Sequence, residues 1–212
     1  MQTQSRQNLR ARSAPAFFRR IGKRGWNESG HFTFTSAYPV LRRWLVAQLP
    51  QKQTILTVGC GTGELEQILE RRGHQVVSLD ISYDMLKTTA ERGLERLVQA
   101  DAHMLPFTST CFDVVILPET LGYVDPDLTF QEAASVLRKD GRLLITSYPL
   151  HLSAHAFYKK VSASEISCSL ARVGFSVEGR RFLIVKRTVV REAEMEGGCS
   201  LLFILARKKA FR

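Results

Sequence analysis

Three alternate glycines directly after an apolar run restrict the fold of this chain more than any other feature. Residues 55–63 read Ile-Leu-Thr-Val-Gly-Cys-Gly-Thr-Gly. The apolar part suits a buried strand, and the glycines permit a tight turn into a helix and let a ligand approach bare backbone. Seventeen residues after Gly63, Asp80 ends a second apolar run and offers a carboxylate that can accept from two ribose hydroxyls. The two signals together predict a nucleotide site on a strand–turn–helix unit.

The spacing of the glycines indicates which nucleotide to expect. Gly59-x-Gly61-x-Gly63 differs from the dinucleotide fingerprint G-x-G-x-x-G, whose third glycine would fall at Glu64. A pyrophosphate ligand is therefore disfavoured. Val-Gly-Cys-Gly-Thr-Gly, followed by Ser-Leu-Asp-Ile-Ser and by Gln-Ala-Asp-Ala at 99–102, resembles the class I S-adenosylmethionine (SAM)-dependent methyltransferases over roughly residues 50–207. Residues 115–127 and 137–145 resemble the branch that contains quinone-biosynthesis and other small-molecule methyltransferases.

Length and composition favour one soluble domain. The chain has 212 residues, of which 44% are hydrophobic, enough for one well-buried domain and too few for two. No apolar stretch approaches the roughly eighteen residues of a membrane-spanning helix, and no signal-peptide core is present, so we expect a cytoplasmic protein. The four cysteines are far apart and form no C-x-x-C pair, which predicts neither a metal site nor a disulfide framework. They are Cys60, Cys111, Cys168 and Cys199.

The net charge of +10 comes from the two ends of the chain. Residues 1–30 contribute +6 and residues 207–212 contribute +4, so residues 31–206 balance at nineteen against nineteen. The basic N-terminal segment suits three roles: a solvated lid, an arm that contacts RNA or the periphery of a membrane, and an organelle transit peptide. We favour the lid. Phe17, Phe18 and Ile21 would share one face of a helix over 14–22, as in a lid or a lipid-binding helix.

Alternation of strand and helix patterns predicts an α/β, Rossmann-like fold with a doubly wound, mostly parallel seven-stranded sheet. A helix from Ser36 to about Gln48 precedes the sheet, and the resemblance implies that the last two strands pair antiparallel at one edge. We divide the chain into an N-terminal lid segment, 1–35, and a SAM-binding methyltransferase domain, 36–212. Strands are expected at 54–58, 75–79, 96–99, 112–117, 142–147, 174–185 and 200–206, and helices at 63–72, 83–92, 128–138 and 163–172.

The resemblance places the cofactor at the carboxyl ends of the strands, where parallel sheets bind ligands. It implies that the glycine turn borders the methionyl part of SAM, that Asp80 binds the ribose hydroxyls, and that Asp101 receives the adenine amino group. Ile81 would pack on the adenine, and Leu117 and Pro118 would line the path of the methyl group. The implied cofactor-binding residues are Thr57, Gly59, Cys60, Gly61, Gly63, Asp80, Ile81, Asp101, Ala102, Leu117 and Pro118.

Two positions depart from the family pattern. Relatives usually carry an acid at the position of Thr57, and another acid such as Glu119 could compensate for its absence. Tyr123 stands where several quinone-type enzymes place a histidine as general base, and a phenol with a pKa near 10 is a poor base at neutral pH. An aligned methyl transfer from a sulfonium needs a base only if the nucleophile must lose a proton. The candidate catalytic residues are Tyr123, Glu119 and His151.

The predicted function is transfer of a methyl group from SAM to an oxygen, nitrogen or sulfur atom of a small molecule or lipid, with S-adenosyl-L-homocysteine (SAH) as product. Two alternatives stay open: an RNA- or protein-directed methyltransferase that uses the basic termini, and a non-catalytic SAM-binding protein for regulation or assembly. Since residues 148–162 are too few for a helical insertion, the cover of the substrate must come from elsewhere. The sources are the N-terminal segment, this short loop, the 186–199 connection, or a protein partner such as a second copy.

Overall fold

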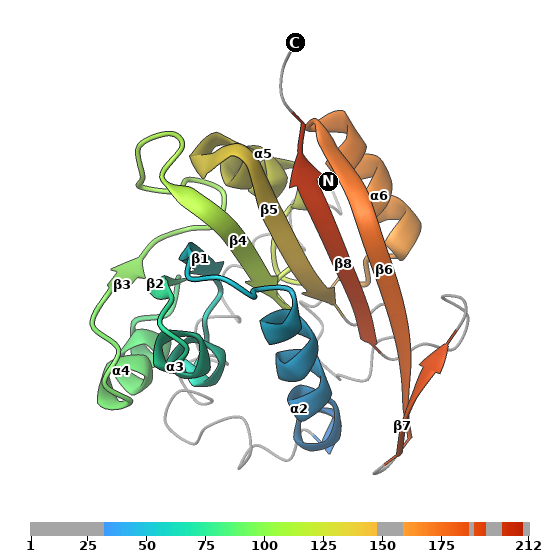
Figure 1. Ribbon diagram of the computed structural model, residues 1–212, viewed down its shortest axis with the longest axis horizontal. Coiled ribbons are helices and arrows are strands. Elements are labelled where there is room, and N and C mark those ends of the chain that lie inside the picture. Colours follow the sequence, from blue (N-terminus) through green and yellow to red (C-terminus); the bar gives the residue numbers. More distant parts are fainter. Residues whose placement is uncertain (1–31, 148–158, 187–188, 194–200, 210–212) are drawn as a thin grey trace, which may run out of the picture.

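The computed structural model describes residues 32–147, 159–186, 189–193 and 201–209. Helices and strands alternate through the first three quarters of the chain, as the sequence predicts (Figure 1). In order, the elements are α2 (Phe32–Ala47), β1 (Thr54–Val58), α3 (Glu64–Arg71), β2 (Gln75–Asp80), α4 (Tyr83–Glu91), β3 (Leu97–Gln99), β4 (Phe112–Pro118), α5 (Pro126–Val136), β5 (Leu137–Ser147), α6 (Ala163–Arg172), β6 (Phe175–Lys186), β7 (Val189–Ala193) and β8 (Leu201–Lys208).

The strands form one sheet in the order β3-β2-β1-β4-β5-β8-β6-β7. The first five pair in parallel, and β8 lies antiparallel between β5 and β6. The doubly wound α/β class and the seven expected strands are therefore confirmed. An eighth strand, β7, pairs antiparallel with β6, so part of the 186–199 connection extends the sheet. Val189 and Val190 favour extended backbone, and the open edge of β6 supplies the hydrogen-bond partners.

Helix α2 begins earlier than the sequence pattern indicates. It starts at Phe32, so Ser36 lies inside the helix and does not cap it. Pro39 lies inside the helix, where its missing N–H removes one backbone hydrogen bond of the first turns, yet the helix extends back to Phe32. Four residues that we assigned to the N-terminal lid belong to α2. Residues 1–31, which would form the rest of that lid, lie outside the described part of the chain.

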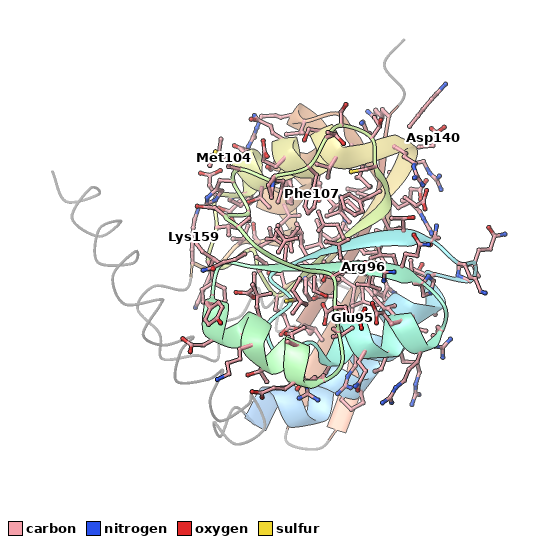
Figure 2. The ribbon with its side chains drawn as sticks, turned by 90° about the vertical axis from the view of Figure 1, so that its left-hand side faces the viewer. Glu95, Arg96, Met104, Phe107, Asp140 and Lys159 are labelled. Carbon is pink, nitrogen blue, oxygen red and sulfur yellow. The ribbon has the colours of Figure 1, made fainter. Side chains whose placement is uncertain are left out.

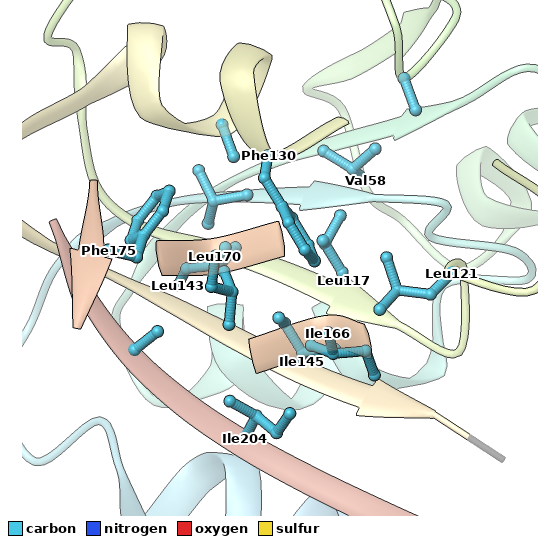
Figure 3. Packing of buried hydrophobic residues seen from close by; sticks show 14 of the residues in the cluster. Val58, Leu117, Leu121, Phe130, Leu143, Ile145, Ile166, Leu170, Phe175 and Ile204 are labelled. Carbon is cyan, nitrogen blue, oxygen red and sulfur yellow. The ribbon is translucent and has the colours of Figure 1, made fainter. Parts of the chain in front are cut away.

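Successive strand residues point to two cores, one on each face of the sheet. Helices α5 and α6 close the first core, where Phe130, Ile166 and Leu170 pack on the strands (Figure 3). Helices α2 and α3 close the second core through Leu45, Leu65 and Leu69. In β1, Leu56 and Val58 belong to the first core and Ile55 to the second. Thr57 shares the face of Ile55, so it points toward the α2 and α3 side of the sheet.

Candidate functional site

The glycine turn after β1 is fixed mainly by contacts with the rest of the protein. Gly59, Gly61 and Gly63 have φ of 81°, 59° and 80°, a region that L side chains avoid. The N–H groups of Gly59 and Cys60 both donate to Leu79 O, at 2.8 and 3.0 Å. The turn is thereby tied to the end of β2. Backbone conformation favours glycine at all three positions before any ligand is considered.

Two threonines close over this turn. A Cβ at Gly59 would lie 2.4 Å from Thr120 Oγ1, and one at Gly63 would lie 2.7 Å from Thr89 Cγ2. The Thr120 hydroxyl donates to Val58 O at 2.7 Å, and the Thr89 hydroxyl donates to Gly61 O at 2.9 Å. The ends of β1 and β4 and the helix α4 therefore meet at the turn. No sequence motif singles out either threonine, because each contact joins residues far apart in the chain.

Asp80 is hydrogen-bonded directly to the glycine turn. Its Oδ2 accepts from Gly61 N–H and its Oδ1 from Ser82 N–H, both at 2.9 Å. Burial raises the pKa of Asp80 to about 6, although these backbone donors favour the charged form. Each carboxylate oxygen keeps a second lone pair, so the carboxylate can still accept from a ribose. That ribose contact stays a prediction.

An ion pair fastens the start of α3 from the side of α4. Arg92 Nε donates to Thr62 O at 2.6 Å, and its Nη2 lies 2.8 Å from Glu64 Oε1. The Thr62 hydroxyl donates to Glu64 Oε2 at 2.6 Å. The two residues of the pair stand 28 positions apart, so only the folded chain reveals the contact. The pair limits movement of the turn between Gly61 and Gly63.

Beneath the turn lies a buried group of polar side chains. Thr57 is fully buried, and its hydroxyl donates to Val77 O at 3.4 Å. Cys60 is also buried, and burial together with the charges of Glu66 and Asp80 raises the pKa of its thiol well above the usual range. Cys60 therefore stays protonated and fills space. Glu66 is fully buried too, and burial raises its pKa to about 8. Its spacing of three residues from the inward-facing Leu69 is the signal by which the sequence could have revealed it.

The segment after β4 carries two of the three catalytic candidates. Glu119 is a buried, non-glycine residue with φ of 58°, and its N–H donates to Thr146 O and Oγ1 at 2.9 and 3.1 Å. Such a conformation costs about 1–3 kcal/mol and concentrates at functional sites. Tyr123 is partly exposed, and its N–H donates to Thr120 O. His151, the third candidate, lies outside the described residues.

The two residues at the end of β4 that we expected to line the path of the methyl group differ in exposure. Pro118 is partly exposed where the strand ends. Leu117 is fully buried and belongs to the core closed by α5 and α6 (Figure 3). Its side chain therefore packs in the protein interior. The assignment of both residues to the path of the methyl group stays a prediction.

Asp101 lies in a network that the sequence does not reveal. His103 Nδ1 lies 2.9 Å from Asp101 Oδ1, and His103 Nε2 accepts from Asp125 N–H at 2.8 Å. The Asp125 side chain caps α5 by accepting from Leu128 N–H. His103 thus links the loop after β3 to the start of α5 and acts as a structural bridge. Ala102, between Asp101 and His103, is buried.

The exposed large apolar side chains of the described residues all follow the carboxyl ends of strands. They are Ile81, Tyr83, Met104 and Leu128, exposed by 59%, 67%, 76% and 48%. We call the edge of the sheet at which β1 to β5 end the carboxyl edge. Figure 2 shows Met104 and Lys159 on one side of the molecule and Asp140 on the other. Lys159 N–H donates to Gly122 O at 2.7 Å, which places the start of the α6 segment beside the loop that carries Tyr123.

The C-terminal basic residues take part in the fold. Arg207 forms an ion pair with Glu178 across β8 and β6, and Lys208 Nζ donates to Leu137 O at 2.8 Å. These two cations are therefore partly occupied by contacts within the chain. Within the described residues, no helix has both the length and the apolar character needed to cross a membrane.

The chemistry of the carboxyl edge fits a cationic nucleoside such as SAM. Asp80 and Asp101 offer carboxylate acceptors after β2 and β3, and the exposed Ile81 offers an apolar surface for a base. The buried carboxyl of Glu66 lies beneath the glycine turn, where a positive charge would compensate it. These residues are brought to one edge by the parallel strands that precede them.

Comparisons with known proteins agree with this chemistry. Residues 56–145 match a family model described as a methyltransferase domain, Methyltransf_11. The chain is 37% identical over 102 residues to the malonyl-[acyl-carrier protein] O-methyltransferase of Herminiimonas arsenicoxydans, covering 46% of this chain and 39% of that protein. It is 28% identical over 166 residues to the ubiquinone biosynthesis O-methyltransferase of Xanthomonas axonopodis pv. citri (strain 306), covering 74% and 69%.

A solved structure supports the fold. The SAM-dependent methyltransferase of Thermotoga maritima, described as a possible histamine N-methyltransferase, superposes with a TM-score of 0.72 at 20% identity. The match covers 91% of this chain and 98% of the other. At this identity the likeness concerns the fold alone. The chain spans about two fifths to two thirds of the length of the two curated relatives.

Proposed function

We propose that this protein is a SAM-dependent methyltransferase that methylates an oxygen, nitrogen or sulfur atom of a small molecule or lipid. In support, residues 56–145 match the model of a methyltransferase domain. The cofactor of this family is SAM, and its product is SAH. The two relatives named above are both O-methyltransferases of acyl or quinone compounds by name. We infer the kind of methyl acceptor that this protein uses from the site itself.

The observation that carries the proposal is the apolar rim of the carboxyl edge. Met104 and Leu128 follow β3 and β4, the strands next to the cofactor residues, and both are well exposed. Apolar surface beside a few polar groups is typical of sites for small organic ligands. Arg207 and Lys208, in contrast, are engaged within the sheet, which leaves less free positive charge for RNA at this end of the chain.

Residues of this chain would contribute to the reaction mainly by position. When bound, SAM supplies an activated methyl group, and the electron pair of the broken S–C bond stays on sulfur. Glu119 lies at the end of β4, in a loop that Thr146 and Thr120 hold to the neighbouring strands. We propose that its carboxylate takes up the proton that a hydroxyl or ammonium group of the substrate loses. The backbone at Glu119 is held in the left-handed region, with φ of 58°, a conformation that concentrates at functional sites.

A turnover assay tests the proposal. The protein is incubated with SAM and with a catechol, a thiol and a primary amine in turn, and SAH and the methylated product are quantified by mass spectrometry. We expect equal amounts of both with at least one acceptor. Glu119→Gln should lower kcat roughly 100-fold for the catechol and less for the thiol, which ionises more readily. SAM binding without turnover of any of these acceptors would favour the non-catalytic alternative, and turnover only with added RNA would favour the RNA-directed one.

A further inference from the structure

Glu66 is a buried acid against which no cation stands among the described residues. Its side chain is fully buried in the first turn of α3. Among the described residues, neither carboxyl oxygen has a hydrogen-bond partner of normal geometry. The Thr57 hydroxyl is near enough to favour the charged form, but its own hydrogen bond goes to Val77 O. A buried polar group without a partner costs about 1–3 kcal/mol, so its presence calls for a reason.

The groups around Glu66 increase its isolation. Asp80 at the end of β2 and Glu64 on α3 both disfavour a negative charge on Glu66, and Cys60 in the turn has no positive form. The backbone N–H of Glu66 favours the charge, but burial outweighs it and raises the pKa. Arg92, the cation that contacts the start of α3, is already paired with Glu64. Glu66 and Asp80 thus form an acidic pair under the glycine turn.

The cofactor is the one component of the reaction with a surplus of positive charge. SAM carries a sulfonium, an ammonium and a carboxylate, and therefore has one net positive charge. SAH carries a neutral sulfur and has none. A negative charge about 10 Å from the sulfonium, at an effective dielectric constant of about 20, changes the affinity for SAM roughly tenfold without affecting a neutral sulfur.

We propose that Glu66, together with Asp80, forms a buried negative pole beneath the glycine turn that favours cationic SAM over neutral SAH. The pole acts through the turn by its electric field, so Glu66 is a positioning residue and makes no contact with the ligand. Binding of SAM draws the proton from Glu66, and loss of the positive charge on sulfur after methyl transfer returns it. This inference rests on the use of SAM and is independent of the identity of the methyl acceptor.

Titration calorimetry of SAM and SAH tests this inference. The wild-type protein, Glu66→Gln and Glu70→Gln are each titrated near pH 7.5 in buffers of different ionisation enthalpy, which gives the number of protons released. Glu70 lies one turn further along α3 in an exposed ion pair with Arg96 and serves as the matched control. We expect the wild type and Glu70→Gln to release a substantial fraction of a proton with SAM and less with SAH. Glu66→Gln should lose this difference, and near pH 7.5 its preference for SAM over SAH should fall about threefold, because Glu66, with a pKa of about 8, is only partly ionised in the free protein. The fall should approach tenfold near pH 9.

The dependence on pH gives a second, independent measurement. From about pH 6.5 to 9 the preference of the wild type for SAM should rise, while that of Glu66→Gln should change less. The amino group of each ligand titrates equally with both proteins, so the comparison of the two isolates Glu66. Equal weakening of SAM and SAH, or unchanged proton release in Glu66→Gln, would overturn the inference and leave the proposed function intact. Absence of binding of either ligand to the wild type would overturn both.

Discussion

The backbone N–H of Gly61 donates to Asp80 Oδ2 at 2.9 Å, which joins the turn after β1 to the acid after β2. Two features that are separate in the sequence are therefore halves of one contact. The other oxygen of Asp80 accepts from Ser82 N–H at the start of α4. A change at Asp80 consequently acts on the shape of the turn and on any ligand that the carboxylate binds.

Replacement of Asp80 should weaken SAM binding strongly. Hydrogen bonds to charged groups contribute about 1.5–3 kcal/mol, so Asp80→Ala should raise the Kd for SAM roughly 10- to 150-fold in calorimetry. Glu91→Ala, an exposed acid at the end of α4, removes the same formal charge without touching the turn and should leave the Kd unchanged. An unaltered Kd in Asp80→Ala would remove the assignment of this residue to the cofactor.

Replacement of Gly59 should destabilise the fold through contact with Thr120. Gly59→Ala and Gly93→Ala both place an L side chain in the left-handed region, at φ of 81° and 87°. An added Cβ meets Thr120 Oγ1 at 2.4 Å in the first case and nothing within 4 Å in the second. We expect Gly59→Ala to cost about 1–3 kcal/mol more than Gly93→Ala in urea unfolding. Equal losses would show that backbone conformation alone requires the glycine.

A double-mutant cycle separates the two causes further. Thr120→Ala removes the atom that a Cβ at position 59 would meet, together with the hydrogen bond to Val58 O. The extra loss in Gly59→Ala should therefore shrink when Thr120 is already alanine, by about 1 kcal/mol or more. Strict additivity of the two substitutions would mean that the side chains at 59 and 120 do not compete for the same space.

The parallel half of the fold follows from local patterns. Each of β1, β2 and β4 is an apolar run of five to seven residues, and the glycine turn marks where the first crossover begins. The start of α2 at Phe32 does not follow, because Pro39 inside the helix favours a later start. The strand β7 does not follow either, because its two valines are a weak signal on their own. Residues 189–193 read Val-Val-Arg-Glu-Ala, with no alternation, and the edge of β6 decides their conformation.

The site shows the same division between local and distant contacts. Asp80 and the glycines are recognisable because their roles belong to a short, regular motif. The helical spacing of Glu66 from Leu69 indicates that Glu66 is buried, but its neighbours Thr57 and Asp80 come from other elements. The role of His103 likewise depends on Asp125, which lies 22 residues away. At the position of Thr57 the chain has a buried hydroxyl, and a buried acid beside it, Glu66, comes from α3.

Removal of the His103 bridge should loosen the start of α5. His103 Nε2 is the acceptor for Asp125 N–H, and one such hydrogen bond contributes about 0.5–1.5 kcal/mol. In His103→Ala, the amide of Asp125 should therefore exchange with solvent roughly 2- to 10-fold faster, as measured by NMR. Met104→Ala changes the exposed neighbour and should leave that rate as it is. An Asp125 amide equally protected in His103→Ala would show that the cap of α5 does not depend on the bridge.

Stability should fall with rising pH because of Glu66. Burial raises its pKa from the ordinary 4.5 to about 8, so between these values the unfolded chain holds fewer protons than the folded one. The stability that protonation of Glu66 gives the folded state is fully present below pH 4.5 and is lost as the pH rises to about 8. The pKa of Asp80 is raised from 3.8 to about 6, so Asp80 adds a further loss of stability that ends near pH 6. In urea unfolding, Glu66→Gln should therefore be more stable than the wild type near pH 8.5 and lose less stability between about pH 6.5 and 8.5. Glu70→Gln should follow the wild type, whereas equal slopes in all three proteins would mean that Glu66 is not protonated in the folded state.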